Sequence, residues 1–240
     1  MYDNELDHGN EGTKGRPSDM SASIPDYPEE MVSDVVTQLG TPLHVRPIRP
    51  DDAPLLLDFH RRLSLRSVYR RYLYVHRVLS DAEVERFTHV DYLDRLALVA
   101  EDDHGLVAVA RYDRIPDTSD AEVAFVVADE YQNHGIGTML LEQLAAAAWQ
   151  RGITAFVATT LAENQKMRDV FANSGFPVTT AWEDDTVGVH FPITPNDVYR
   201  AACRTRHERL RAVAGDDETP DGVAPCGGGG ALKPTKEERR

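Results

Sequence analysis

The amino-acid sequence predicts a mixed α/β (α+β) fold built on one sheet. The first half contains two apolar runs joined by a short acidic segment that ends in Gly105, which is typical of a β-hairpin. The second half alternates strands with helices, as in 121–128, 135–150 and 153–160. Because this alternation brings parallel strands together and hairpins give antiparallel pairs, we expect a mixed sheet and not a doubly wound parallel one.

The elements up to the hairpin follow from short local patterns. A strand is expected at 43–49, and helical stretches are expected at 51–63 and roughly 66–75. Ser80 is followed three residues later by Glu83, and this capping box marks the start of a third helix. The two apolar runs that form the hairpin strands are 96–100 and 106–111.

The later elements are also marked by spacing and by glycine. Apolar residues recur every four positions along the long helix: Ile136, Leu140, Leu144 and Ala148. A shorter helix at 164–174 is ended by Gly175. The last two strands are expected at 176–182 and 187–193, joined by an acidic turn.

The chain divides into four predicted segments: 1–40, 41–194, 195–214 and 215–240. The first is an acidic extension, mostly disordered because its few aliphatic residues cannot offset the entropy of ordering. Within it, Pro28 and Gly40 suit the start and the stop of a short helix over 28–39. The second is the folded domain, the third a C-terminal helix, and the glycine-rich fourth a flexible tail.

The composition disfavours several classes of function. Lys and Arg number 26 against 40 Asp and Glu, a net charge of −14, which is opposite to the charge that nucleic-acid binding requires. The longest uncharged stretch, 170–182, is too short to cross a bilayer. Cys203 and Cys226 give no disulfide framework, and no histidines have the spacing of metal ligands. We therefore expect a cytoplasmic protein with no metal, membrane or nucleic-acid partner.

The most informative stretch is a glycine-containing turn between a strand and the long helix. Residues 126–138 run from an apolar strand through Gly135 and Gly137 into that helix. Such a turn directs free backbone N–H groups toward one point at the positive end of the helix dipole, which suits a pyrophosphate. The dinucleotide fingerprint fails because Leu140 replaces its third glycine, and no Gly-Lys-Ser/Thr of a P-loop occurs. The two glycines alone favour a plain strand-to-helix turn.

Two motifs resemble those of the GNAT superfamily of acyl-CoA-dependent N-acyltransferases. The first, Q/R-x-x-G-x-G/A, is matched by Gln132, Gly135 and Gly137. The second, an Asn-led helix that ends in Gly-Phe, is similar to 163–167 with 175–176, and the order of elements over 43–193 is similar as well. The resemblance implies a mostly antiparallel central sheet flanked by helices, with two parallel central strands that splay apart.

The resemblance also implies acetyl-CoA as cosubstrate and a set of residues that bind it. The pyrophosphate would be bound by the backbone amides of Gln132, Asn133, His134, Gly135, Ile136, Gly137 and Thr138. Val126 and Val127 would pair through their backbones with the pantetheine arm, and Asn164 would hydrogen-bond the pantetheine or the neighbouring backbone. The His134 side chain either touches a phosphate or lies on the surface.

One carboxylate interrupts the apolar strand that leads into the turn. Glu122 is either at an edge of the strand exposed to solvent, as the preceding Asp120 would suggest, or a general base. A lysine amine with a pKa of about 10.4 is almost wholly protonated at pH 7, so a nearby carboxylate would help to neutralise it. The stretch 121–125, together with 45–52 and 62–64, resembles the bacterial protein-lysine acetyltransferase branch, in which this glutamate is the base.

Many GNAT enzymes protonate the departing thiolate with a tyrosine on the second-motif helix. The corresponding position here is Phe171, which carries no exchangeable proton. The proton would then come from water or from the substrate ammonium, or another group such as Tyr131 would take part.

The sequence thus predicts an acetyl-CoA-dependent N-acetyltransferase in which an amine attacks the thioester directly in a ternary complex. A protein lysine is the expected acceptor, and a small-molecule amine is the alternative. A third hypothesis is a non-catalytic acyl-CoA-binding module that contacts a partner through the 28–39 helix or through arginines at 61–71.

Overall fold

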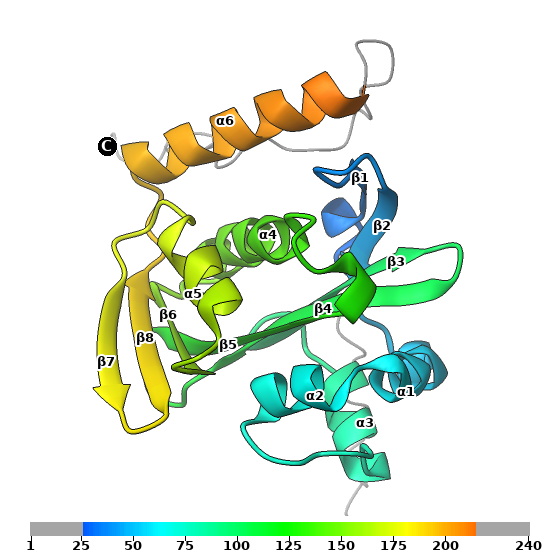
Figure 1. Ribbon diagram of the computed structural model, residues 1–240. Helices are drawn as coiled ribbons and strands as arrows, with labels where there is room; N and C mark the ends of the chain where they lie inside the picture. Colours follow the sequence, from blue (N-terminus) through cyan, green and yellow to red (C-terminus); the bar gives the residue numbers. More distant parts are fainter. Residues whose placement is uncertain (1–25, 215–240) are drawn as a thin grey trace, which may run out of the picture.

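Apolar strands build a central sheet in the computed structural model, which describes residues 26–214 (Figure 1). The predictions for residues 1–25 and for the tail 215–240 lie outside these described residues. Within the described part, eight strands form one sheet in the order β1-β2-β3-β4-β5-β6-β8-β7. The β5–β6 pair is parallel and the other neighbouring pairs are antiparallel, so the predicted mixed sheet is confirmed.

The strands are β1 Ser33–Val36, β2 Pro42–Pro47, β3 Arg95–Asp102, β4 Gly105–Arg114, β5 Asp120–Val127, β6 Ala155–Leu161, β7 Thr179–Glu183 and β8 Thr186–Pro192. The middle of β3 and of β4 is buried on both faces, because helices cover the sheet from both sides. In β5 the odd-numbered positions from Ala121 to Phe125 are buried, and Glu122 between them is exposed.

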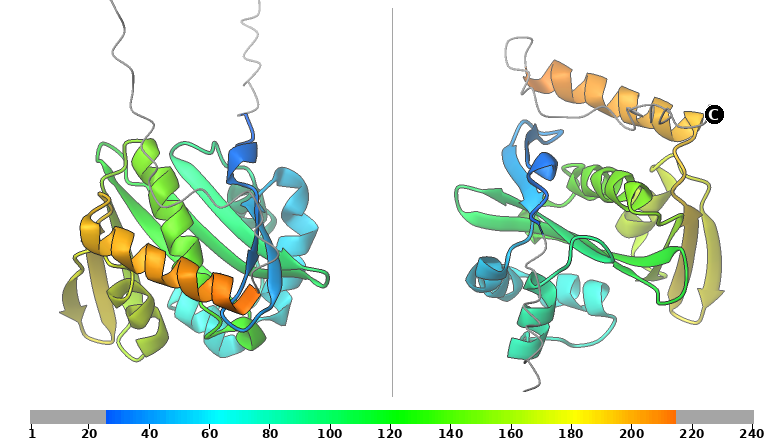
Figure 2. Two further views of the ribbon diagram at one scale, coloured as in Figure 1. Left: turned by 90° about the horizontal axis from the view of Figure 1, so that it is seen from above. Right: turned by 180° about the vertical axis from the view of Figure 1, so that it is seen from behind.

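Two groups of helices cover opposite faces of the sheet (Figures 1 and 2). On one face lie α1 Ala53–Arg62, α2 Leu65–Tyr72 and α3 Asp81–Thr88. On the other lie α4 Ile136–Gln150 and α5 Gln165–Ala172. The capping box predicted for the third helix is confirmed, since Ser80 Oγ accepts from the Glu83 backbone N–H and the Glu83 carboxylate accepts from the Ser80 backbone N–H.

The helix predicted over 28–39 is wrong. Only a single 3₁₀ turn forms at Glu29–Met31, and β1 then pairs with β2 from Ser33 opposite Val45 to Val36 opposite Pro42. An isolated helix of about 12 residues is marginal, and the β-branched side chains of this segment favour a strand. The pairing satisfies the backbone hydrogen bonds of the segment on the sheet, so the predicted acidic extension contributes the edge strand of the fold.

The parallel pair β5–β6 is short. Asp120, Ala121 and Glu122 lie opposite residues 155–157, and beyond Glu122 the two strands separate. The strand β5 continues to Val127 along β4, while β6 continues to Leu161 along β8. The predicted splaying of the two central parallel strands is therefore confirmed. It opens a gap in the sheet, which has α4 and α5 on one face and α2 on the other.

A C-terminal helix, α6 Asp197–Ala214, lies across the α4 side of the sheet in all views (Figures 1 and 2). Asn196 caps it by accepting from the Tyr199 N–H, and the Tyr199 ring stacks on Phe176 with centroids 4.3 Å apart. Arg206 forms an ion pair with the buried Glu142 of α4 and donates to the Asn173 carbonyl at 2.9 Å. Burial raises the pKa of Glu142, and the Arg206 guanidinium opposes that rise.

This ion pair leads to a prediction about how α6 is held. Arg206→Met leaves the Glu142 carboxylate buried without its cation, and we expect a loss of about 3 kcal/mol in the free energy of unfolding at neutral pH. The raised pKa means that the folded variant keeps a proton which the unfolded chain has lost, so its stability should recover as the pH falls through that pKa.

Urea denaturation at several pH values measures both effects. The double variant Glu142→Leu/Arg206→Met replaces the pair with apolar side chains and should regain most of the lost stability. A double variant as unstable as the single one would show that packing, and not the ion pair, holds α6.

Candidate functional site

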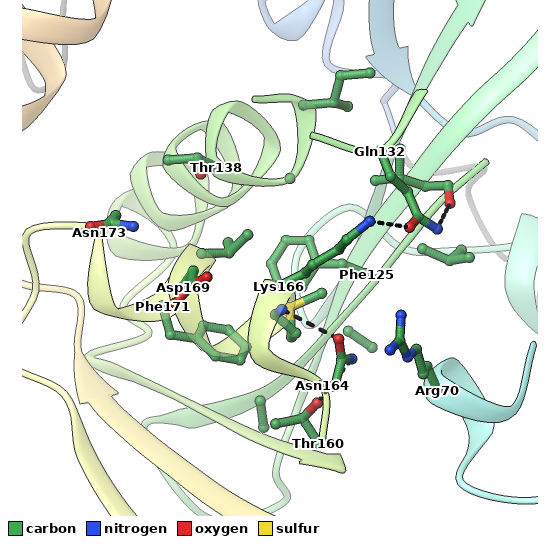
Figure 3. Close-up of a pocket in the computed structure, with 18 of the residues that line it drawn as sticks. Arg70, Phe125, Gln132, Thr138, Thr160, Asn164, Lys166, Asp169, Phe171 and Asn173 are labelled. Atoms are coloured by element: carbon green, nitrogen blue, oxygen red, sulfur yellow. Dashed lines mark hydrogen bonds between the residues drawn. The ribbon is translucent and has the colours of Figure 1, made fainter. Parts of the chain in front are cut away.

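A cavity of about 810 Å³ fills the opening where β5 and β6 separate. Its walls come from α2, β5, β6, the turn that follows β5, α5 and α6 (Figure 3). The volume lies in the range of small-molecule and cofactor sites. The cavity therefore joins the two motifs that the sequence singled out, although they lie about 30 residues apart in the chain.

The turn between β5 and α4 exposes unpaired backbone N–H groups to this cavity. Asn133 and Gly135 have left-handed backbones, with φ of 70° and 82°, and α4 begins at Ile136. Within residues 26–214, no hydrogen bond leads from the N–H groups of Ile136, Gly137 and Thr138 to an acceptor in the protein. First-turn N–H groups have no partner inside a helix, so they are available to an anion at the positive end of the helix.

Hydrogen bonds from neighbouring elements fix the position of this turn. Asp129, just before it, accepts from the Ser64 N–H, the Ser64 hydroxyl and the Ser67 hydroxyl at 2.7–2.9 Å. Burial would raise the pKa of Asp129, but these hydrogen bonds outweigh it and lower that pKa. The start of the turn is thereby tied to α2 on the opposite face of the sheet.

The Gln132 side chain makes a second set of contacts (Figure 3). Its amide nitrogen donates to the Ser67 hydroxyl at 3.0 Å and to the Val127 carbonyl at 3.3 Å. Its amide oxygen accepts from the Lys166 Nζ of α5 at 3.2 Å. The glutamine of the first motif thus links α2, β5 and α5, which leaves the backbone of the turn as the surface that faces the cavity.

Most of the residues that the sequence singled out come together around the cavity. Those that line it are Glu122, Val126, Val127, Gln132, Asn133, Gly135, Ile136, Gly137, Thr138 and Asn164. His134 is not among the lining residues, and its ring lies beside that of Tyr131 with centroids 5.9 Å apart. A side-chain contact of His134 with a phosphate thus lacks support from its position, although its backbone belongs to the turn.

Asn164 caps α5 and is buried. Its side-chain oxygen accepts from the Met167 N–H at 3.4 Å, and its amide nitrogen donates to the Thr160 hydroxyl at 3.2 Å. Asn164 thus contacts the neighbouring backbone, one of its two predicted partners, and its contact with the pantetheine stays a prediction.

Glu122 lies at the last paired position of the parallel ladder, opposite Val157. Its strand runs between β4 and β6, so Glu122 does not lie on an edge strand of the sheet. The side chain is exposed, but it is exposed to the cavity. Alternation along the strand places it on the same face as Ala124 and Val126, opposite to Phe125, whose ring meets Phe171 of α5 at 6.2 Å between centroids.

Phe171 and Tyr131 are the two aromatic residues considered for proton transfer. Phe171 is buried among Phe125 and Phe191 and borders the cavity without any polar atom. The Tyr131 hydroxyl donates to the Asp102 carboxylate, and this bond raises the pKa of Tyr131 to about 12. Tyr131 is therefore a weak acid whose proton is already shared.

Several residues at the cavity were not predicted from the sequence. Gln38 follows β1 and lines the cavity, and its N–H donates to the His134 carbonyl at 3.2 Å. Its amide atoms lie 2.8 Å from the position that a Cβ at Gly135 would take. Because residues 28–39 were interpreted as a helix, no sequence signal placed Gln38 near the turn. Thr205, Arg206 and Arg209 of α6 also line the cavity.

The cavity has the opposite charge to the rest of the chain. Among its described lining residues, the basic side chains are Arg70, Arg71, Lys166, Arg206 and Arg209, and the acidic ones are Glu122 and Asp169. The chain as a whole carries −14. A basic cavity in an acidic protein favours a ligand with several negative charges.

Comparison with known proteins assigns the family. The model of the acetyltransferase (GNAT) family matches residues 63–176. The GNAT domain of PAT from S. lividans is 39% identical, with a TM-score of 0.66, over 70% of this chain and 99% of that domain. The chain belongs to the GNAT family of acetyltransferases.

One further relative shares sequence with the chain, and a more distant structure shares its fold. Acetyltransferase Pat from Mycolicibacterium smegmatis is 32% identical over 65% of this chain, and the match spans 46% of Pat, so the chain covers about half the length of that relative. The structure of yncA from Salmonella typhimurium with its cofactor acetyl-CoA is 17% identical, with a TM-score of 0.54 over 65% of this chain and 96% of that chain, and it shares the fold. The predicted resemblance to bacterial protein-lysine acetyltransferases is thus confirmed at the level of relatedness.

Other findings concern the described residues alone. Within 26–214, no helix is long and apolar enough to cross a bilayer. The same residues contain no group of three or more His, Cys, Asp or Glu placed to hold a metal ion. The expected absence of a metal and the roles of the individual site residues stay predictions.

The turn gives a direct test of ligand binding. A Cβ at Gly137 would lie 3.4 Å from Val170, so Gly137→Ala should fold and bind acetyl-CoA with little change. The two methyl groups of Gly137→Val would occupy space beside the N–H groups of the turn. We therefore expect the affinity for acetyl-CoA to fall roughly a hundredfold, a loss of about 3 kcal/mol in binding free energy.

Titration calorimetry on both variants, with circular dichroism as a check of folding, measures this. Unchanged affinity in folded Gly137→Val would remove the turn from the binding site. Gly135 is unsuitable for this test. Its φ of 82° disfavours any residue with a Cβ, and a Cβ there would clash with the Gln38 side chain, so a substitution would destabilise the fold as well.

Proposed function

We propose that this chain is an acetyl-CoA-dependent N-acetyltransferase whose acceptor is an amine, in the first place a protein lysine side chain. The observation that carries the proposal is the presence in one basic cavity of an amide-lined turn and, at the point where the strands part, a carboxylate. An acyl-CoA binder needs the first of these features, and an amine acetyltransferase needs both.

The residues present fit the predicted cosubstrate. The unpaired N–H groups of residues 136–138 would bind the pyrophosphate, and the Lys166 Nζ lies beside the turn through its bond to Gln132. The edge of β5 that faces β6 has no strand partner from residue 123 to Val127, so its backbone can pair with the amides of the pantetheine arm. When bound, acetyl-CoA supplies the activated acetyl thioester.

Glu122 would act as the general base. At pH 7 only about 1 in 2,500 free lysine side chains is neutral, a deficit of about 4.6 kcal/mol that a carboxylate near the nitrogen relieves. Glu122 takes the proton of the attacking amine directly or through one water, and the acetyl group passes to nitrogen as the thiolate leaves.

No dedicated acid is required for the thiolate. A thiol of pKa about 8.5 is a good leaving group, so water or the acceptor ammonium can return the proton. Phe171 cannot donate one, and the Tyr131 proton is already shared with Asp102.

The lysine acceptor rests on relatedness to Pat and to PAT, and a small-molecule amine remains the alternative within the same chemistry. Of the two surfaces that the non-catalytic module would use, the 28–39 helix does not form, because β1 Ser33–Val36 pairs with β2, and the arginines at 61–71 remain. A thiol-release assay with acetyl-CoA and a panel of lysine peptides and small amines separates these functions. Turnover on peptides supports the proposal, turnover on small amines alone favours the alternative, and binding without turnover on any acceptor favours the module.

The cytoplasmic location of the protein stays a prediction.

A variant of Glu122 tests the mechanism. Glu122→Gln keeps the size of the side chain and removes the proton acceptor, so kcat/KM should fall about 10²–10⁴-fold at neutral pH. The defect should shrink as the pH rises, because more of the acceptor amine is then already neutral. Acetyl-CoA affinity should be nearly unchanged, since the turn and not this carboxylate binds the cosubstrate.

The matched control is Glu183→Gln, which neutralises an exposed carboxylate on β7 away from the cavity and should behave as wild type. The measurement is kcat/KM of wild type and both variants from about pH 6.5 to 10. A loss below about threefold for Glu122→Gln across that whole range would exclude Glu122 from the mechanism.

A further inference from the structure

The helix α6 forms the outer wall of the cavity, although it lies beyond the residues 63–176 matched by the family model. The cavity lining continues from Thr138, in the first turn of α4, over Val170 and Asn173 to α6. On α6, the lining residues Arg206 and Arg209 are three positions apart and therefore share one face of the helix. One continuous surface thus connects the turn with two guanidinium groups.

The two arginines differ in how their charges are compensated. Arg206 is paired with the buried Glu142 and donates to the Asn173 carbonyl, so its charge is largely used within the protein. Arg209 is exposed at the cavity, and it forms no ion pair with any residue in the described part of the chain. The acid on the α5 wall, Asp169, accepts from the Gln165 side chain at 2.7 Å. On the α6 wall, Arg209 is therefore the cation whose charge is available to a ligand.

Coenzyme A carries its phosphates in two places, the pyrophosphate and the 3′-phosphate of the adenosine. If the pantetheine arm runs from the turn toward Glu122, the adenosine extends from the other side of the pyrophosphate. The cavity continues on that side toward α6. A phosphate monoester carries nearly two charges at neutral pH, and a guanidinium is the side chain best suited to bind it through paired N–H groups.

We propose that Arg209 binds the 3′-phosphate of the acyl-CoA cosubstrate, on a helix that the Arg206–Glu142 ion pair holds in place. The proposal rests on the proposed function, because it takes acyl-CoA as the ligand of the cavity. It assigns to α6 the recognition of the one phosphate that distinguishes coenzyme A from its 3′-dephospho form.

The test compares two ligands that differ only in that phosphate. Titration calorimetry with coenzyme A and with 3′-dephospho-coenzyme A is carried out on the full chain. The variants are Arg209→Gln and, as a matched control, Arg204→Gln, which removes an exposed arginine of the same helix that does not line the cavity.

Wild type should bind coenzyme A roughly three- to tenfold more tightly than the dephospho form, as expected for one solvent-accessible arginine–phosphate contact. Arg209→Gln should abolish that preference by weakening coenzyme A alone, and Arg204→Gln should keep it. The preference should also decrease at high salt, because the contact is exposed.

Two results overturn the proposal. Equal affinity of wild type for both ligands would show that the 3′-phosphate makes no contact. Equal weakening of both ligands by Arg209→Gln would show that the arginine acts on the shape of the site or on another part of the ligand. Either result leaves acetyl-CoA as the cosubstrate intact, whereas failure of wild type to bind coenzyme A at all overturns the proposed function together with this inference.

Discussion

The site depends on the early end of the parallel ladder between β5 and β6. Three residue pairs hold the strands together up to Glu122, and the next five residues of β5 lose their partner on that side. Leaving backbone N–H and C=O groups unpaired inside a protein costs free energy unless water or a ligand satisfies them. The same separation provides the cavity, sets Glu122 at its apex and brings the following turn to its rim.

The turn itself is a strained element that its neighbours hold in place. Asn133 is not glycine, yet its backbone is left-handed, which costs free energy for a side chain with a Cβ. Bonds from α2 to Asp129 and from Gln132 to three elements fix the chain before the strained residue, and Gln38 packs against Gly135 after it. Because these contacts already determine the geometry of the turn, the N–H groups need no further ordering when an anion arrives. Pre-organisation of this kind reduces the entropic cost of binding.

Local signals predicted the sheet, the central helices and the residues of the turn, because spacing, glycine and capping act over a few residues. The pattern of 28–39 failed for the same reason: valines spaced for a helical face also suit a strand, and only pairing with β2 decides between them. The position of Gln38 depends on that pairing, and the position of Arg209 depends on the docking of α6 through Arg206 and Glu142. Long-range contacts of this kind leave no mark in the local sequence. The placement of Glu122 could be predicted only because its strand and turn resemble those of a known family.

The opposite charges of the chain and the cavity reflect the range over which charges act. At physiological salt, exposed charges are screened beyond about 8 Å, so the net −14 of the chain has little effect on an anion already inside the cavity. Inside the cavity, the anion interacts with the nearby cations. Of these, Arg206 is paired with Glu142, and the Arg70 guanidinium lies 4.0 Å from the Glu163 carboxylate. Pairing leaves few cations free, and it also keeps those arginines ordered around the opening. An acidic chain can therefore bind a polyanion, provided that its few uncompensated cations and its free backbone N–H groups converge on one cavity.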